Sequence, residues 1–125
     1  MIDTSKITDM CLMFFDCKSL QNLDVSKWDV SNVRSMAYMF HCCTSLQNLD
    51  VSGWDVSNVT NMVCVFNGCE SLQSLDVSGW DVSSVTDMGY MFYGCSSLHT
   101  DTTMWKINTK DMESMYHDAP YIKHN

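Results

Sequence analysis

The seven cysteines are the side chains best able to do chemistry in this chain of 125 residues. Four of them recur every 26 residues, at Cys17, Cys43, Cys69 and Cys95. If repeats stack at the spacing of paired strands, about 5 Å, neighbouring thiols come within reach of disulfide geometry. Ala119 occupies the next position of this column, however, and a small buried hydrophobe explains both residue types. We therefore predict free thiols in the core, and the remaining cysteines, which share no spacing, fit a reducing compartment.

A metal site is the second chemical possibility. The methionines recur with the repeat, but their spacing is that of an apolar stripe rather than of soft-metal ligands. The four histidines show no metal-ligand spacing among themselves. His41 beside Cys42 and Cys43 is a weak signal for zinc. We predict no metal site and no cofactor.

Catalysis has no support in the sequence. We recognise no nucleophile–base arrangement, no glycine-rich phosphate loop and no paired carboxylates outside the repeat. Serine and aspartate recur with the repeat, as turn formers and helix caps do. We predict that the protein is not an enzyme and has no catalytic residues.

Two rows of aspartates are candidates for binding. They are Asp24, Asp50 and Asp76, within each predicted strand, and Asp29, Asp55 and Asp81, after each tryptophan. The second row is best explained by bonds to backbone amides in a turn. Like charges in register repel, so the first row needs compensation by neighbouring hydroxyls or amides, or a use. The row could bind a cationic partner, hold a Ca²⁺ ion between the aspartates of adjacent repeats, or imitate the phosphates of a nucleic acid.

These side chains are carried on a repeat of 26 residues. Residues 45–62 recur as 19–36 and as 71–88. Such a period is typical of repeats that bury their apolar faces only against their neighbours. The Leu-x-x-Leu-x-Val segment of each repeat predicts a short strand that pairs in parallel with the next repeat, and the following tryptophans are expected to stack about 5 Å apart.

The rest of each repeat predicts a short helix. Val33, Met36, Met39 and Cys43 follow a spacing of three to four residues, and Ser31 precedes them as a candidate N-cap. We therefore predict an α/β fold, a right-handed solenoid of the leucine-rich-repeat type, with short parallel strands on one face and short helices on the other.

The two ends of the chain differ. We predict one domain, residues 1–125, of about four units plus a degenerate C-terminal capping unit, residues 97–125, whose polar substitutions meet water. Pro120 helps to end the last helix. The N-terminal unit has no comparable cap, so its apolar edge is a candidate for fraying, for self-association or for contact with a missing upstream unit.

The repeat resembles a known family. The pattern M-x-x-M-F-x-x-C-x-S-L-x-x-L-D-V-S-x-W-D-V-S-x-V is present at residues 10–33, 36–59 and 62–85, with Val65 in place of the second methionine in the third copy. A fourth copy begins at Met88 and loses register after Leu98. The pattern is similar to the BspA-like leucine-rich-repeat family, the bacterial surface protein 26-residue repeat. The resemblance implies a non-catalytic scaffold that binds other molecules, often on cell surfaces.

The copies differ mainly on the predicted helix side. Aromatic and imidazole side chains there are Phe15, Tyr38, His41, Tyr90 and Tyr93. A repeat scaffold keeps its stacking residues and can vary the face that meets a partner, where aromatics serve as contact anchors. The alternative is that these positions simply tolerate change. We predict that the five residues bind a partner, together with the Asp24, Asp50 and Asp76 row.

Charge and hydropathy set further limits. The net charge of −8 argues against direct binding to nucleic acid, and no secretory signal or membrane span is visible. A cytoplasmic location is expected if the chain is complete, and a cell-surface location if it is a fragment of an exported protein. We predict a non-enzymatic protein-binding repeat module. The alternative is a small acidic inhibitor, encoded by a mobile element, that blocks a basic nucleic-acid-binding surface by charge mimicry; its mark would be an aspartate row without local hydrogen bonds.

Overall fold

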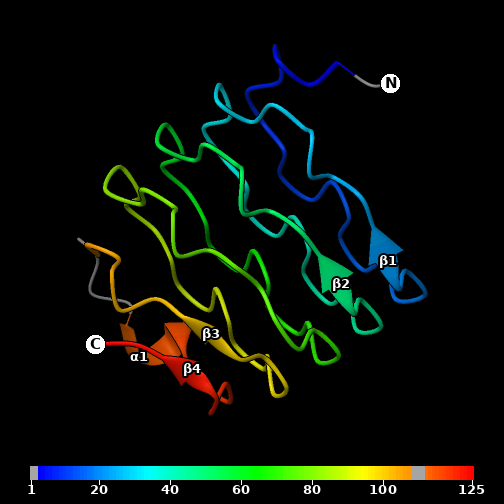
Figure 1. Ribbon diagram of the computed structural model, residues 1–125, viewed down its shortest axis with the longest axis vertical. Helices are drawn as coiled ribbons and strands as arrows, with labels where there is room; N and C mark the ends of the chain where they lie inside the picture. Colours follow the sequence, from blue (N-terminus) through cyan, green and yellow to red (C-terminus); the bar gives the residue numbers. More distant parts are fainter. Residues whose placement is uncertain (1–2, 108–111) are drawn as a thin grey trace.

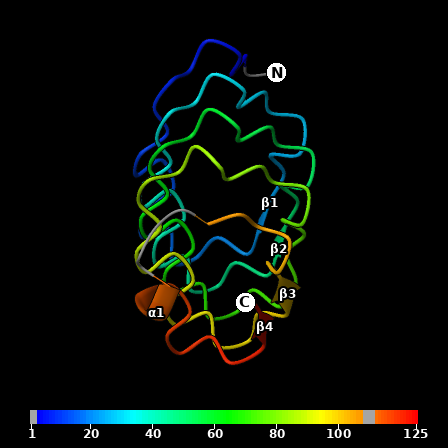
Figure 2. The same cartoon turned by 90° about the vertical axis from the view of Figure 1, so that its left-hand side faces the viewer.

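The computed structural model describes residues 3–107 and 112–125. The chain winds into coils that follow one another from the N-terminal to the C-terminal end (Figure 1), and Figure 2 shows them one behind another as flattened ovals. Each coil contributes one ring to a column of stacked aromatics. We number the coils one to five by these rings, which belong to Phe14, Phe40, Phe66, Phe92 and Tyr116.

Regular strands are short and lie on one side of the stack (Figure 2). Strand β1 (Asn22–Leu23) pairs in parallel with β2 (Asn48–Leu49), and β3 (Thr100–Asp101) pairs in parallel with β4 (Ile122–Lys123). Asn22 lies opposite Asn48, one repeat further along the chain. The expected parallel pairing of successive repeats is confirmed for this pair.

The predicted fold class is wrong. Among the described residues the only helix is α1 (Met112–Met115), of four residues, and the strands form two separate sheets of two strands each. The segments predicted as helices in coils one to four are turns instead. The molecule is therefore mostly irregular chain, and it is not an α/β solenoid of the leucine-rich-repeat type.

Tight turns replace the predicted helices. In coil two, the Met39 N–H donates to the Met36 carbonyl at 3.0 Å, and the Cys43 N–H donates to the Phe40 carbonyl at 3.2 Å. The third residue of the first turn, Tyr38, has a φ of 59°. A positive φ at the third residue defines a type II turn. We call the segment that carries these turns in each coil the turn segment.

Alternate N–H groups of the turn segment bond to the next coil. The Met36 N–H donates to the Asn61 carbonyl at 3.0 Å, and the Phe40 N–H donates to the Val65 carbonyl at 2.9 Å. In an α-helix these donors would bond within their own segment. Helices also pack about 8–10 Å apart, whereas paired strands are about 4.8 Å apart. Turns thus let both sides of a coil keep the same spacing, which stacked helices would not allow.

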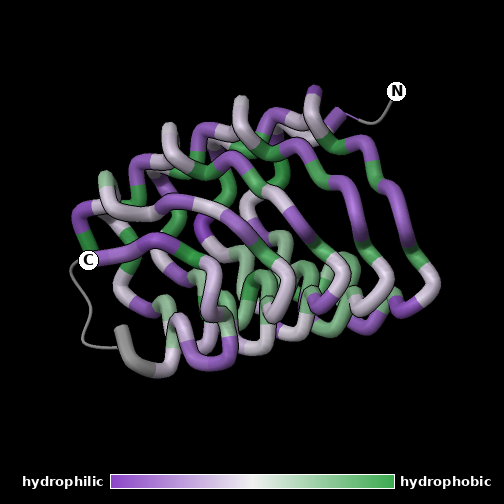
Figure 3. Tube along the Cα trace, turned by 60° about the horizontal axis from the view of Figure 1, so that its bottom comes forward, coloured by the Kyte–Doolittle hydropathy of each residue, from purple (hydrophilic) through white to green (hydrophobic). Residues whose placement is uncertain are grey.

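The apolar spacing of three to four residues buries side chains in turns as it would in a helix. Met36, Met39, Phe40 and Cys43 are each 0% exposed. Hydrophobic residues recur at the same places in successive coils (Figure 3). The predicted helical character was therefore wrong, while the assignment of these residues to the core is confirmed.

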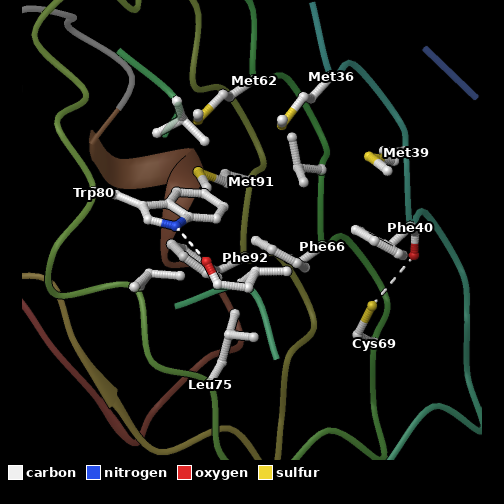
Figure 4. Packing of buried hydrophobic residues seen from close by; sticks show 14 of the residues in the cluster. Met36, Met39, Phe40, Met62, Phe66, Cys69, Leu75, Trp80, Met91 and Phe92 are labelled. Carbon is white, nitrogen blue, oxygen red and sulfur yellow. Dashed lines mark hydrogen bonds between the residues drawn. The ribbon is translucent and has the colours of Figure 1, made fainter. Parts of the chain in front are cut away.

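Aromatic columns and polar contacts join the coils inside the core (Figure 4). The Phe40 and Phe66 rings lie 5.7 Å apart with planes 1° from parallel. Trp80 stacks on its counterpart in the preceding coil at 6.5 Å, somewhat further than predicted. The Trp80 Nε1–H donates to the Val51 carbonyl at 2.9 Å, and the Cys69 thiol donates to the Phe40 carbonyl at 3.2 Å. Each of these polar contacts crosses from one coil to its neighbour.

The C-terminal end departs from the 26-residue repeat by two residues in all, since Tyr116 follows Phe92 by 24 positions. Ser74 bridges to His99, only 25 positions further on, and the register of the following turn is then restored because Trp105 stacks on Trp80 at 6.2 Å. The Tyr116 and Thr102 hydroxyls are hydrogen-bonded at 2.6 Å, which closes coil five against coil four. Residues 108–111 of the predicted capping unit lie outside the described residues.

The cysteine column is buried and reduced. All seven cysteines lie among the described residues and none of them forms a disulfide. Cys43, Cys69 and Cys95 are each 0% exposed, and burial raises the pKa of Cys43 to about 11 and that of Cys95 to about 12. The prediction of small buried hydrophobes is confirmed for these three residues.

We expect iodoacetamide to leave Cys43, Cys69 and Cys95 unmodified in the native protein at pH 8, and to modify the half-buried Cys11 and Cys17 first. A pKa of about 11 instead of 9.0 leaves a thiolate fraction about 100-fold smaller, and burial blocks access as well. Mass spectrometry of timed samples measures the order, with denatured protein as the control. Equal rates for Cys69 and Cys11 in the native state would contradict the burial described above.

Gly68 and Gly94 provide a second test. Both have positive φ, 79° and 73° respectively, but a Cβ at Gly68 would lie 3.3 Å from the Cys42 Sγ, whereas one at Gly94 would meet only ordinary contacts. We expect Gly94→Ala to lower the free energy of unfolding by about 1 kcal/mol through the left-handed backbone, and Gly68→Ala to lower it further. Denaturant unfolding measures both. In a Cys42→Ala background the two costs should become equal, and a persisting difference would exclude the thiol contact as its cause.

Candidate functional site

The turn segments lie on one side of the stack, opposite the strands (Figure 2). Two columns run along this face. One contains Leu12, Tyr38, Cys64 and Tyr90, and the other contains Phe15, His41, Asn67, Tyr93 and His117. We call the nine residues the turn face.

Three predicted binding residues form a cluster at the N-terminal end of the turn face. The Phe15 ring stacks on the His41 imidazole at 5.1 Å with planes 12° apart, and the Tyr38 ring lies tilted at 5.5 Å from the same imidazole. Phe15 is 43% exposed and Tyr38 is 37% exposed. The structure therefore brings Phe15, Tyr38 and His41 together at the surface.

The other two predicted aromatics form a second cluster, in coils four and five. Tyr90 meets Tyr93 edge-on at 5.8 Å, and Tyr93 stacks on His117 at 5.4 Å. Tyr90 is 50% exposed. Sequence reasoning missed His117, although it continues the column of Phe15 and His41, 24 positions after Tyr93 instead of 26.

Coil three separates the two clusters. Its side chains in the two columns are Cys64 and Asn67, and the Asn67 amide donates to the Cys64 Sγ at 3.7 Å. Cys64 is buried, and its proximity raises the pKa of Tyr38. The turn face thus carries two aromatic patches with a polar coil between them.

Three of the four residues in the first column are exposed, and they share one backbone conformation. Leu12, Tyr38 and Tyr90 have φ values of 62°, 59° and 56°. L-residues other than glycine, asparagine and aspartate adopt this region rarely. It belongs here to the type II turns, which carry the next residues, such as Met39 and Phe40, into the core. The backbone therefore sets where Tyr38 and Tyr90 project from the turns, and each ring also packs against a neighbouring ring.

The Asp24, Asp50 and Asp76 row has local hydrogen bonds. One Asp50 carboxylate oxygen accepts the Ser52 N–H at 3.0 Å and the Ser52 hydroxyl at 2.7 Å. Asp24 and Asp76 bond in the same way to the serines two positions on. This is the compensation by hydroxyls and amides that the sequence left open as one explanation of the row.

The second row uses the same motif. Asp29 and Asp55 each accept the N–H and the hydroxyl of the serine two positions further on. Asp3 and Asp101 extend the two rows in the same way, with Ser5 and Thr103 as donors. Sequence reasoning missed both as row members, because Asp3 lies in the incomplete first unit and Asp101 follows the deletion.

These bonds set the electrostatics of the rows. The serine hydroxyl and amide lower the pKa of Asp50, while the neighbouring Asp24 carboxylate acts in the opposite direction. The carboxylates are exposed, and shallow depressions beside the strands are lined by Asp24, Asp50, Asp76 and Asp101. The rows do not converge on one point, so they offer an extended acidic strip rather than a pocket.

One group of side chains has the composition of a metal site. Donor atoms of Asp16, His41 and Cys42 all lie within 4.8 Å of one another. Burial lowers the pKa of His41, which keeps the imidazole neutral at neutral pH. The sequence showed only the adjacency of His41 and Cys42, because Asp16 comes from the preceding coil.

Comparison with known proteins supplies a family. The family model described as "Mycoplasma protein of unknown function, DUF285" matches residues 1–74 and again residues 21–125. The chain belongs to the DUF285 family. Overlapping matches are expected for a chain whose units repeat. No curated protein and no solved structure matches this DUF285 chain.

Within the described part of this DUF285 protein, no helix has the length and apolar character needed to cross a membrane.

The aspartate motifs predict a loss of stability in acid. Hydrogen bonds lower the folded-state pKa of Asp24, Asp50 and Asp76 below the ordinary 3.8, so their contribution is present above that value and is lost as the pH falls through the folded-state pKa. We expect Tm to fall below about pH 4, as followed by circular dichroism. Replacing Ser26, Ser52 and Ser78 with alanine should make this fall shallower. Parallel curves for the two proteins would contradict the role of the hydroxyls.

Proposed function

We propose that this DUF285 protein is a non-enzymatic protein-binding module whose contact surface is the turn face. The observation that carries the proposal is the pair of exposed aromatic clusters around His41 and Tyr93. Rings of this kind bury large areas at little conformational cost and are enriched at the energetic centres of interfaces. The similarity of the repeat to the BspA-like pattern supports the same class of function.

Rigidity of the scaffold also supports this proposal. The N–H groups of Leu12 and Tyr38 bond to the carbonyls of Ala37 and Val63 in the following coils, at 3.0 and 2.9 Å. A ring carried by a backbone that is bonded to its neighbour loses little further freedom when a partner binds. The two aromatic patches, separated by the polar coil three, fit a partner that contacts the stack along its length.

Charge mimicry is the weaker proposal. An inhibitor of a basic surface would present aspartates whose oxygens are free of local bonds. One oxygen each of Asp24, Asp50 and Asp76 is instead used by a neighbouring serine. These bonds favour a role for the row in turn structure.

Capture experiments with three matched baits test the proposal. The turn-face bait carries Tyr38→Asn and Tyr90→Asn, because asparagine removes the ring and tolerates a left-handed backbone. The acidic-row bait carries Asp24→Asn, Asp50→Asn and Asp76→Asn. The surface control carries Met104→Asn, which removes a side chain that is 79% exposed and outside the turn face.

We expect the wild-type, acidic-row and Met104→Asn baits to retain the same protein from a host lysate, and the turn-face bait to lose it. Retention should change little between low and high salt, because aromatic contacts are weakly screened. Quantitative mass spectrometry of the retained proteins measures both effects. Loss with the acidic-row bait together with a steep decrease at high salt would favour charge mimicry and overturn the proposal.

A further inference from the structure

Three potential metal ligands meet where coil one contacts coil two. Asp16 belongs to coil one, His41 and Cys42 belong to coil two, and their donor atoms all lie within 4.8 Å of one another. The Cys42 Sγ and the His41 Nε2 are 3.9 Å apart. The Asp16 N–H donates to the His41 carbonyl at 2.8 Å, so the backbone itself holds the two coils together at this point.

The backbone position that carries two of these ligands favours glycine. Asp16 and Cys42 have φ values of 60° and 58°, and the matching residues of coils three and four are Gly68 and Gly94, with φ values of 79° and 73°. Cys42 therefore stands at this position in coil two although the conformation is unfavourable for it, whereas aspartate, present as Asp16 and again as Asp118 in coil five, tolerates it better. Gly68 also leaves room for the thiol, since a Cβ there would lie 3.3 Å from the Cys42 Sγ.

The imidazole is held by two neighbouring rings and by a hydrogen bond between its Nε2 and the Cys42 Sγ. His41 lies against Phe15 at 5.1 Å and against Tyr38 at 5.5 Å. Its Nδ1 is the buried side-chain atom that has no hydrogen-bond partner among the described residues. The ring thus directs Nε2 toward the thiol while its other nitrogen is enclosed.

We propose that Asp16, His41 and Cys42 bind a zinc ion. Thiolate, imidazole and carboxylate are the ligand types that zinc takes in proteins, and three such ligands leave a fourth position for water. Ligand atoms of a tetrahedral zinc site lie about 3.5 Å apart, so the observed 3.9 Å between Sγ and Nε2 needs only a small closure. Binding replaces the thiol proton of Cys42, which is released to solvent.

The ion would join the end of the stack to its neighbour. Coil one contacts a following coil but no preceding one among the described residues, and Phe15 and Leu12 are left exposed there. A bond from Asp16 through the metal to His41 and Cys42 adds a link across this contact and fixes one imidazole of the turn face. The proposal stands whether or not the turn face binds a protein.

Titration with Co²⁺ tests the site in the full chain, kept reduced with a phosphine that does not chelate the metal. We expect one equivalent of Co²⁺ to give a sulfur-to-metal charge-transfer band and the visible bands of a tetrahedral ion, both abolished by added Zn²⁺. Cys42→Ser should remove the charge-transfer band. Asp16→Asn, at an exposed position where asparagine tolerates the backbone, should weaken binding by about 100-fold or more.

Matched controls separate this site from other thiols and imidazoles. Cys17→Ser alters the half-buried cysteine next to Asp16, and His117→Gln alters the imidazole that takes the place of His41 in coil five. Both should bind Co²⁺ like the wild type, and Zn²⁺ should raise Tm in both but not in Cys42→Ser. An absent charge-transfer band in the wild type, a band that persists in Cys42→Ser, or a band lost in Cys17→Ser would each overturn the proposal.

Discussion

Everything in this molecule depends on one spacing, because neighbouring coils must stay about 5 Å apart on both sides at once. On one side the spacing is set by strand pairs such as β1 and β2, and on the other by N–H groups like that of Phe40, which donates to Val65 in the next coil at 2.9 Å. Aromatic rings fit this spacing between coils by stacking face to face, as Phe40 and Phe66 do with planes 1° from parallel. The thiol of Cys69 and the indole of Trp80 add polar contacts to carbonyls of the preceding coil.

This constraint separates what the sequence could predict from what it could not. The repeat period, the parallel pairing and the core columns follow from identical residues at fixed intervals, and residues such as Phe66 and Cys69 are buried as expected. The conformation between the strands did not follow, because a spacing of three to four residues suits consecutive type II turns as well as a helix. The residue type at Tyr38 does not indicate a turn rather than a helix, because tyrosine seldom has positive φ. The usable signal was in other copies, where Gly68 and Gly94 occupy a second left-handed position of the same segment.

The candidate site shows the same division. The sequence named Phe15, His41, Tyr90 and Tyr93 as candidates without pairing them, and the structure stacks Phe15 on His41 and places Tyr90 against Tyr93 because residues one repeat or three positions apart are neighbours on the turn face. For the Asp29, Asp55 and Asp81 row, bonds to backbone amides were predicted, and Asp29 and Asp55 accept them. The bonding of the Asp24, Asp50 and Asp76 row stayed open, because a serine two positions on is equally compatible with an exposed, unpaired carboxylate. Asp16 was missed as a neighbour of Cys42 although the two are 26 positions apart, because two unlike residue types do not stand out as one column of the repeat.

Columns of unlike residues behave differently from columns of like residues in such a stack. A phenylalanine column can be extended by one more ring without adjustment, as Tyr116 stacks on Phe92 at 6.0 Å. In the mixed column, each member limits the next: the Cys42 Sγ fits because Gly68 has no Cβ, and the side chain of Asp16 lies near that thiol because its backbone N–H is bonded to coil two. Changes on this face are therefore coupled between adjacent coils. When a residue on the turn face differs between copies, its neighbours in the adjacent coils must be compatible with it. Function on this face therefore depends on clusters of neighbouring side chains rather than on single positions.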